Sequence, residues 1–180
     1  MDSPTWPSSP GFATCVRTRP GADSGVMDDR PTAAATPRWR FGSADLEADE
    51  IEALLRRNWW GTFATSAADT PYGVPVVYGY DGQNFYVASA SGRKVSNVEA
   101  NPRVSLTVVE VESDASAWSS VIVLGTAEFV KDPAGYLQAL RALRRQRGHA
   151  GTVGPKDAAR LARARVMRIT PSEVTGRTKA

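Results

Sequence analysis

The hydrophobic and polar positions first become periodic near residue 45, where the pattern predicts a helix. Either Ser43 or Asp45 can cap this helix, because short polar side chains accept hydrogen bonds from the free amides of a first turn. An apolar stripe at helical spacing follows, made of Leu46, Ile51, Leu54 and Leu55. Acidic residues begin the segment and arginines end it, which is the charge order that the helix dipole favours. We therefore expect an amphipathic helix with one face in the core.

Most of the remaining pattern has the two-residue period of half-buried strands. Strands are predicted over residues 60–67, 74–80, 85–89, 103–112, 119–130 and 165–170. Helices are predicted over residues 92–100, 133–147 and 156–162. The turns between the strands are short, which indicates antiparallel pairing. The predicted fold is mainly β, a six-stranded antiparallel barrel with peripheral helices.

The first 38 residues show neither period. Residues 1–37 hold six of the 12 prolines among many small and polar residues, so they cannot bury enough surface to offset their ordering entropy. We expect residues 1–38 to be a disordered extension and residues 39–180 to form the folded domain. Cys15 lies in the extension, where it is expected to be an incidental thiol rather than a nucleophile.

The composition excludes several classes of protein. With one cysteine and one histidine, the chain has no internal disulfide and no zinc site of cysteine and histidine ligands, and we expect no metal. No apolar run approaches the ~20 residues of a membrane-spanning helix, and the first residues lack the apolar core of a secretory signal. The sequence therefore favours a cytoplasmic protein without a membrane partner.

The charge is uneven along the chain. Residues 1–140 carry a net charge of −6, whereas residues 141–180 carry +9. The arginines that begin the basic segment, Arg141, Arg144, Arg145 and Arg147, are not interleaved with stacking aromatics and fit no helix-turn-helix or zinc-finger pattern. This pattern favours a solvated helix face or a site for an anionic small molecule, and disfavours a nucleic-acid partner.

The most informative segment is the end of the strand at residues 85–89 and the helix start that follows it. Ser89 and Ser91 supply hydroxyl groups there, and Arg93 and Lys94 supply two cations. Free amides and the dipole at a helix N-terminus favour an anion, and arginine and lysine both bind phosphate. The segment therefore predicts a phosphate site. The alternative is that both cations are simply exposed, although cations are disfavoured at this end of a helix.

A proline and two tryptophans give weaker signals. Pro75 lies within a predicted strand, which indicates a strand edge or bulge where backbone groups stay free for a planar ligand; an ordinary barrel strand is the alternative. Trp59 and Trp60, just before the first long strand, could wall a substrate space by stacking, or could be ordinary core and rim aromatics.

The order of these segments resembles a known superfamily. The segments are GTFATS, PVVYGYDG, FYVASASGRK, NVEANPRVSLTVVE and WSSVIVLGTAEFV, and the resemblance runs from about residue 46 to residue 176. Together they are similar to the pyridoxamine 5'-phosphate oxidase-like, FMN-binding split-barrel superfamily. The most similar branch is that of the small bacterial members related to nitroimidazole-resistance proteins.

The resemblance implies a six-stranded split barrel that forms a homodimer, with FMN in two clefts at the interface. Residues implied to contact the FMN phosphate are Arg93 and Lys94 with Ser91 or Ser89. The isoalloxazine edge would be lined by Val76, Val77 and Tyr78. Residues implied to reach the flavin from the partner subunit are Trp118 and Ser119. Bound FMN would carry out hydride or electron transfer itself, so that no side chain is required as a catalytic acid.

Two departures from the family pattern narrow the function. The oxidase that forms the vitamin has basic residues at the positions of Gly73 and Tyr78 and a substrate-gripping tail, whereas residues 169–177 here resemble the ending of the smaller relatives. Oxidation of pyridoxamine phosphate is therefore not expected. Members that degrade haem use a histidine, and the only histidine, His149, falls in a predicted solvated loop.

We therefore expect an FMN-dependent oxidoreductase that acts on an unidentified small molecule. Tyr78 is the one candidate for handling a proton near the ring, and Trp59 and Trp60 are the candidates for contacting substrate. Two alternatives stay open: a protein that stores or senses flavin without turnover, and a reductase that uses a deazaflavin in place of FMN.

Overall fold

The computed structural model describes residues 43–114, 116–149, 151–152, 154, 156–157 and 164–179. The expected disordered extension, with Cys15, lies outside these residues, as does most of the helix expected over 156–162. The elements are β1 (Ala44–Asp45), α1 (Ala48–Arg57), β2 (Trp60–Ala67), β3 (Thr70–Tyr80), β4 (Phe85–Ser89), α2 (Arg93–Ala100), β5 (Arg103–Val111), β6 (Trp118–Phe129), α3 (Pro133–Gln146) and β7 (Arg165–Lys179).

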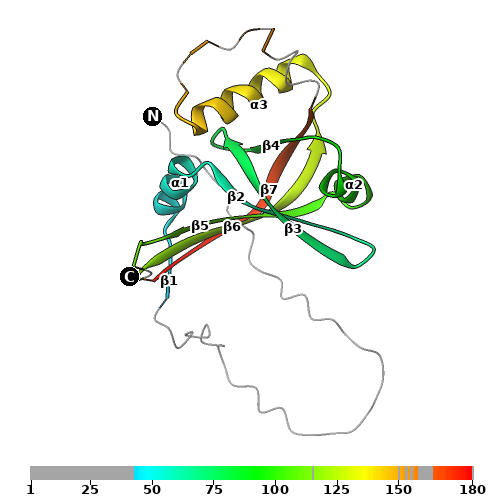
Figure 1. Ribbon diagram of the computed structural model, residues 1–180. Coiled ribbons are helices and arrows are strands. Elements are labelled where there is room, and N and C mark those ends of the chain that lie inside the picture. Colours follow the sequence, from blue (N-terminus) through cyan, green and yellow to red (C-terminus); the bar gives the residue numbers. More distant parts are fainter. Residues whose placement is uncertain are drawn as a thin grey trace, which may run out of the picture. The chain divides into compact units, whose positions relative to one another are not determined.

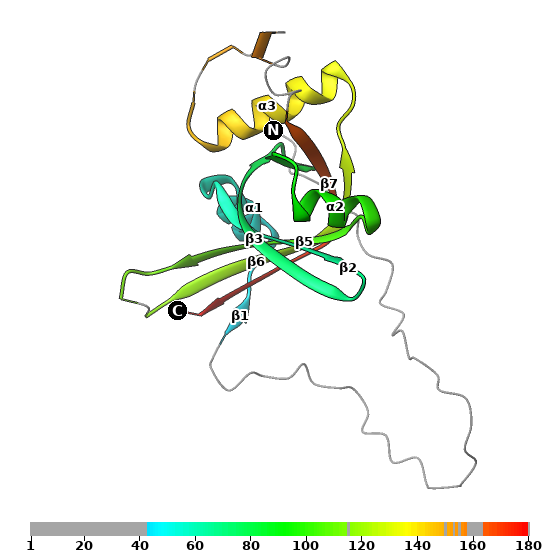
Figure 2. The same ribbon diagram turned by 45° about the vertical axis from the view of Figure 1, so that its right-hand side comes forward.

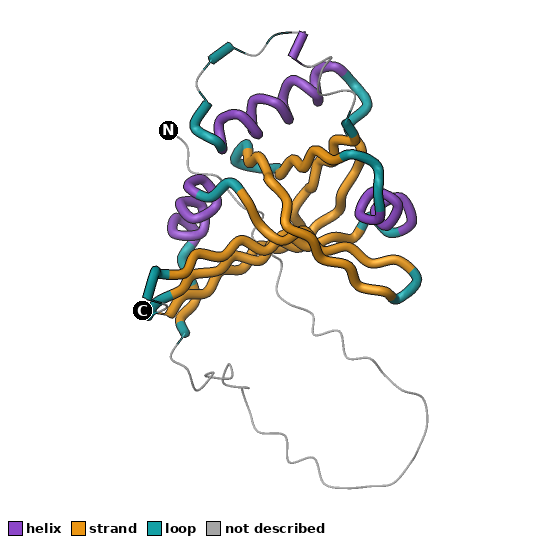
Figure 3. The backbone as a smooth tube through the Cα atoms, in the orientation of Figure 1, coloured by secondary structure: helices purple, strands orange, loops and turns teal. Residues whose placement is uncertain are grey.

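Six strands close into a barrel. The sheet order is β1-β7-β4-β3-β2-β5-β6, and an additional pairing of β7 with β6 closes the ring. Every pairing is antiparallel. Figures 1 and 3 show β5, β6 and β7 continuing beyond the barrel as a twisted ribbon that ends near the C-terminus. The predicted six-stranded antiparallel barrel is confirmed, and β1 is a seventh, two-residue strand beside β7.

The alternating pattern of β5 and β6 gives this ribbon two different faces. Val104, Leu106 and Val108 of β5 are buried, as are Val121 and Val123 of β6. The residues between them point to the other face of the sheet, since successive side chains in a strand alternate. That outer face exposes Val109, Val111, Ile122 and Leu124, each by 41–59%. The strand period was therefore predicted correctly, but the outer face is more apolar than that of an ordinary solvated sheet.

The last strand is much longer than predicted. β7 pairs with β4 near its start and with β6 along almost its whole length, so its 15 residues far exceed the predicted six over 165–170. A register shift beside Gly125 leaves Ser172 as an extra residue, and its hydroxyl donates to the Leu124 carbonyl oxygen. Such a bulge bends a strand, which lets β7 belong to both the barrel and the ribbon.

The first helix begins later than either predicted cap. Ala44 and Asp45 pair with Thr178 and Arg177 of β7, which keeps the backbone extended there. Glu47 is the N-cap instead, and it forms a capping box with Glu50. Leu46 therefore lies before the helix, whereas the other three residues of the predicted apolar stripe, Ile51, Leu54 and Leu55, are all buried in it.

Helix α3 lies across the β3–β4 end of the barrel, as Figure 2 shows from the side. Its contact with β3 is very close at Gly79: a Cβ atom added there would lie 2.4 Å from the Leu143 amide nitrogen. The helix begins where predicted, with Asp132 as N-cap and Pro133 in the first turn. This contact brings the basic end of α3 next to the residues that open the β3–β4 hairpin.

Candidate functional site

The N-terminus of α2 has the features of an anion-binding position. Gly92 precedes it with φ of 154°, a backbone conformation that glycine adopts far more readily than other residues. The helix has no side-chain cap and no acidic residue in its first turn. Within the described residues, the amides of Gly92, Arg93 and Lys94 have no hydrogen-bond partner. Free amides at a helix start attract anions, so this end of α2 is suited to a phosphate.

The two predicted cations lie at this helix start. The Arg93 side chain is exposed, and its guanidinium lies 5.3 Å from the centre of the Tyr72 ring on β3. Lys94 is half-buried. Among the described residues, no carboxylate forms an ion pair with either cation. The charge of both side chains is therefore available to an anion at the free amides of α2.

The two predicted serines differ in their surroundings. Ser91 is exposed and lies directly before the helix start. Ser89 is buried at the end of β4, and its hydroxyl donates to the Ala90 carbonyl oxygen at 2.6 Å. The Ser91 hydroxyl makes no hydrogen bond among the described residues, whereas the Ser89 hydroxyl is already bonded to Ala90.

Strand β3 has the open edge that Pro75 predicted. It pairs with β2 from Thr70 to Val77, whereas its pairing with β4 begins only at Tyr78. One side of residues 70–77 therefore has no strand neighbour in the part of the chain that the structure describes. Val76 is nearly buried and Val77 half-buried at the inner end of this edge, where free backbone groups can face a planar ligand.

The Tyr78 side chain points away from this edge and into the core. It is fully buried, and its hydroxyl donates to the Leu55 carbonyl oxygen at 2.8 Å. Burial, and then the nearby charge of Glu110, raise the pKa of Tyr78 above the usual range for tyrosine. The hydroxyl thus stays protonated and ties β3 to α1. This geometry does not fit the proton-handling role predicted for it, and only the Tyr78 backbone can line a ligand.

Both candidate substrate-contacting tryptophans are about half exposed, at 50% for Trp59 and 48% for Trp60. They are therefore not core residues. Trp60 is paired with Val77 across the β2–β3 ladder, and directly paired residues share one face of a sheet. The Trp60 ring consequently lies on the same side of the sheet as the Val77 side chain.

Two polar side chains that sequence reasoning missed, Gln146 and Glu110, hold the segment before these tryptophans. The Gln146 carboxamide donates to carbonyl oxygens of Leu55, Arg56 and Asn58 at the end of α1. Glu110 accepts from the Arg57 guanidinium and from Asn58, and these contacts hold the pKa of Glu110 below its ordinary value. Gln146 was detectable, because it occupies the same helical face as the buried residues Ala139, Ala142 and Leu143.

Trp118 and Ser119 lie far from α2 within one chain. They begin β6 at the outer end of the ribbon, whereas α2 lies at its other end (Figure 1). Arg103, just after α2, pairs with Thr126, and the strand from Trp118 to Thr126 is about 26 Å long at roughly 3.3 Å per residue. One chain therefore does not bring these two residues to the predicted phosphate site.

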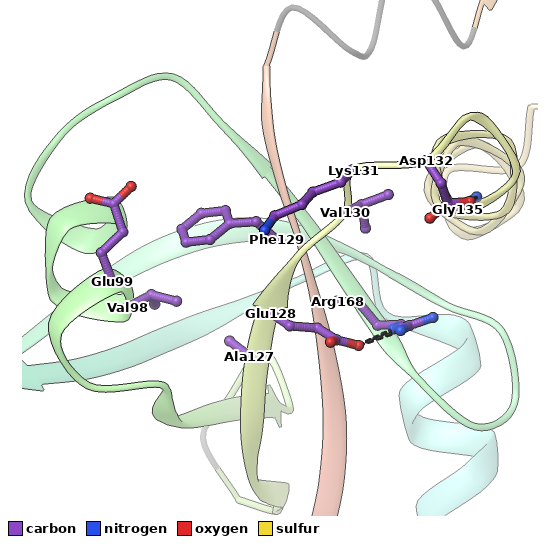
Figure 4. Close-up of a pocket in the computed structure, with 10 residues that line it drawn as sticks. All are labelled: Val98, Glu99, Ala127, Glu128, Phe129, Val130, Lys131, Asp132, Gly135 and Arg168. Atoms are coloured by element: carbon purple, nitrogen blue, oxygen red, sulfur yellow. Dashed lines mark hydrogen bonds and ion pairs between the residues drawn. The ribbon is translucent and has the colours of Figure 1, made fainter.

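A cavity of about 520 Å³ lies between α2, the end of β6 and the start of α3 (Figure 4). Its described lining includes Glu99, Glu128 and Asp132 against Lys131 and Arg168. Glu128 forms an ion pair with Arg168, drawn as a dashed line in Figure 4. Because the charges in this lining are mixed, with an excess of acids, the cavity is a poor site for a phosphate.

A second cavity, of about 340 Å³, lies between α3 and the β3–β4 hairpin, and we call it the α3 cleft. Its described lining consists of Val77, Ala88, Leu140, Leu143, Arg144, Arg147 and His149. The lining is apolar on one side and basic on the other. His149 is exposed in a loop, as the sequence predicted.

No helix in the described part of the chain combines the length and apolar character that crossing a bilayer requires.

These features define a class of protein: a small antiparallel barrel with an uncapped helix start and an open strand edge. The family model described as pyridoxamine 5'-phosphate oxidase matches residues 47–178. The chain belongs to this family, as its segments indicated. An uncharacterized protein of Rhizobium meliloti is 31% identical over 80 residues, which are 44% of this chain and 52% of the relative. The chain thus spans about half the length of that relative.

Solved structures agree with the family assignment. A FAD-binding protein from Mesorhizobium loti is 30% identical with a TM-score of 0.63, over 77% of this chain and 99% of the other. The FAD-binding protein of Mycobacterium smegmatis is 24% identical with a TM-score of 0.55, over 74% and 95%. A candidate 5-nitroimidazole antibiotic resistance protein from Bacteroides thetaiotaomicron is 18% identical with a TM-score of 0.63, over 76% and 87%. The last two likenesses show the fold alone.

Proposed function

We propose that the protein is a flavin-dependent oxidoreductase that binds FMN between the start of α2 and the open edge of β3. The observation that carries the proposal is the start of α2, where free amides, Arg93 and Lys94 meet without a cap or a carboxylate among the described residues. A phosphate fits this position in charge and in hydrogen-bond donors. The FAD-binding function named for the Mesorhizobium loti relative supports a flavin.

Different residues would hold the phosphate and the ring of the cofactor. Arg93, Lys94 and Ser91 would hold the phosphate, and the backbone of Val76 and Val77 would face the ring edge. The bound flavin supplies hydride or electron transfer, and the protein positions it against a small-molecule substrate. Trp60 would then wall the substrate space on the face it shares with Val77.

We further propose that the active form is a homodimer. The outer face of the ribbon exposes Val109, Val111, Ile122 and Leu124, a set of apolar side chains typical of a protein interface. Trp118 and Ser119 begin β6 at the outer end of this ribbon, and Trp118 lies about 26 Å along the strand from Thr126, the partner of Arg103 just after α2. A second copy packed on the outer face would supply them to the flavin of its partner.

The cofactor proposal is tested by titrating FMN into the wild-type protein and into R93Q/K94Q. Loss of two charge-assisted contacts should weaken FMN binding by about a hundredfold or more. The control R141Q/R145Q removes the same charge from exposed positions on α3 and should bind FMN normally. Failure of the wild-type protein to bind FMN, or equal binding by R93Q/K94Q, would refute the assignment.

The same titration distinguishes the alternatives. FAD and a deazaflavin are compared with FMN, because a single phosphate position favours FMN over a dinucleotide. A reduced nicotinamide is then added anaerobically, and loss of the flavin absorbance measures reduction. Rapid bleaching supports an oxidoreductase, whereas a tightly bound flavin that stays oxidised supports storage or sensing.

A further inference from the structure

The α3 cleft has the composition of a binding site for a small organic anion. Four of its described lining residues are apolar: Val77, Ala88, Leu140 and Leu143. The other three are Arg144, Arg147 and His149, and no acidic residue appears among the described residues that line it. The volume of about 340 Å³ lies within the range of small-molecule sites. This differs from the cavity beside α2, where acidic side chains outnumber basic ones.

The basic side of the cleft is built by the end of α3. Leu140, Leu143, Arg144 and Arg147 recur at the spacing that places residues on one helix face. The chain then turns back at Gly148, whose φ of 69° favours glycine, and the His149 amide donates to the Arg144 carbonyl oxygen at 3.0 Å. The turn thereby brings His149 into the lining of the cleft together with Arg144 and Arg147.

The helix dipole does not by itself explain these arginines. Cations are favoured in the last turn of any helix, and Arg145 satisfies that preference as well as Arg144 does. Arg145 and Arg141, however, are not among the lining residues, whereas half-buried Arg144 and exposed Arg147 are. Two arginines of this segment therefore line the apolar cleft and two do not.

The apolar side of the cleft adjoins the proposed flavin position. Val77 lines the cleft and also ends the open edge of β3. Its cross-strand partner Trp60 exposes its ring on the same face of the sheet. A molecule with its apolar body against Val77 and its anionic group at Arg144 and Arg147 would lie next to the flavin edge.

We propose that the α3 cleft binds the substrate of the flavin, and that this substrate is a small organic anion with an apolar body. The assignment as substrate rests on the proposed flavin function, whereas the binding of an anion in the cleft does not. The carboxylate or phosphate contacts Arg144, Arg147 and His149, and the apolar body contacts Val77, Ala88 and the two leucines.

The probe for this site is 2-naphthoate, compared with its neutral analogue 2-naphthamide by isothermal titration calorimetry on the flavin-free protein. We expect the acid to bind about tenfold more tightly than the amide, the difference that one charge-assisted contact supplies. R144Q/R147Q should remove this preference and weaken naphthoate about tenfold. The matched control R141Q/R145Q removes the same charge from the same helix and should keep both the affinity and the preference.

Three results would overturn the inference. The acid and the amide bind equally, R141Q/R145Q loses as much affinity as R144Q/R147Q, or R144Q/R147Q loses FMN binding while R141Q/R145Q keeps it. The last result would mean that the cleft holds part of the cofactor. Melting temperatures of both variants, measured alongside, confirm that each is folded. If wild-type protein binds naphthoate selectively but takes up no flavin, the anion site stands and the flavin proposal fails.

Discussion

Replacement of Gln146 by leucine should be among the most destabilising single changes in α3. Leucine keeps the side chain's approximate size but cannot replace the carboxamide, which donates to the carbonyl oxygens of Leu55, Arg56 and Asn58. The Oε1 atom of Gln146 also accepts from the buried Tyr80 amide at 3.3 Å. The substitution thus leaves one buried donor, the Tyr80 amide, without its partner and removes one hydrogen bond from each of the three carbonyl oxygens.

The magnitude follows from the burial of these groups. An unsatisfied buried polar group costs about 1–3 kcal/mol. The Tyr80 amide loses its carboxamide partner, whereas Leu55 keeps the Tyr78 hydroxyl at 2.8 Å, and the carbonyls of Arg56 and Asn58 are only part-buried. We therefore expect Q146L to lower the free energy of unfolding by about 3 kcal/mol, which corresponds to a fall in Tm of roughly 10 °C for a domain of this size.

Urea denaturation, followed by far-UV circular dichroism at neutral pH, measures this change. The control is Q138L on the same helix, where the glutamine is exposed and makes one hydrogen bond, to Asp81 at 2.9 Å. Q138L should stay within about 0.5 kcal/mol of the wild-type protein. A Q146L midpoint equal to that of Q138L, with an unchanged m-value, would refute the view that Gln146 holds α3 to the end of α1.

Three further predictions concern packing, pH and assembly. G79A should lower the free energy of unfolding by about 2–3 kcal/mol, because its Cβ atom would lie 2.4 Å from the backbone of Leu143. Thermal melting measures this change, and the control is G73A, at an exposed strand position with an uncrowded Cβ. Glu110 has a pKa below its ordinary value, so its ion pair with Arg57 stabilises the fold above the usual glutamate pKa and is lost as the pH falls through the lowered value. E110Q should therefore lower the free energy of unfolding, measured by urea titration, by about 0.5–1 kcal/mol at pH 7 and by less near pH 3. An equal loss of stability at both pH values would contradict this. I122K on the exposed outer face should shift sedimentation from dimer to monomer, whereas T126K farther along β6 should not.

The proposed phosphate site shows how far local sequence reasoning reaches. Ser91, Arg93 and Lys94 lie within four residues of one another, the helix starts directly after Gly92, and it ends before Pro102. Such features act over a few residues, so sequence alone was enough to predict the segment. The open edge at Pro75 was predictable for the same reason, because proline lacks an amide donor.

Residues that meet from distant segments were not predictable in this way. Arg144 and Val77 belong to elements separated by three strands and a helix, and only the close contact at Gly79 sets α3 against the β3–β4 hairpin. The direction of the Tyr78 side chain depended likewise on a hydrogen bond to Leu55 of α1. The sequence of β3 alone therefore did not show that the Tyr78 hydroxyl is buried while the Tyr78 backbone can line a ligand.

The sequence by itself determined the order and type of most elements, because helical and strand periods, caps and prolines act within single segments. It also indicated the barrel and the anion-binding helix start. The tertiary structure decided the length of β7, the late start of α1 and the composition of the α3 cleft. Each of these depends on pairing or packing between residues far apart in the chain, such as Asp45 with Arg177. The free energy of such long-range pairing depends on the closed barrel as a whole, so a local sequence pattern does not predict it.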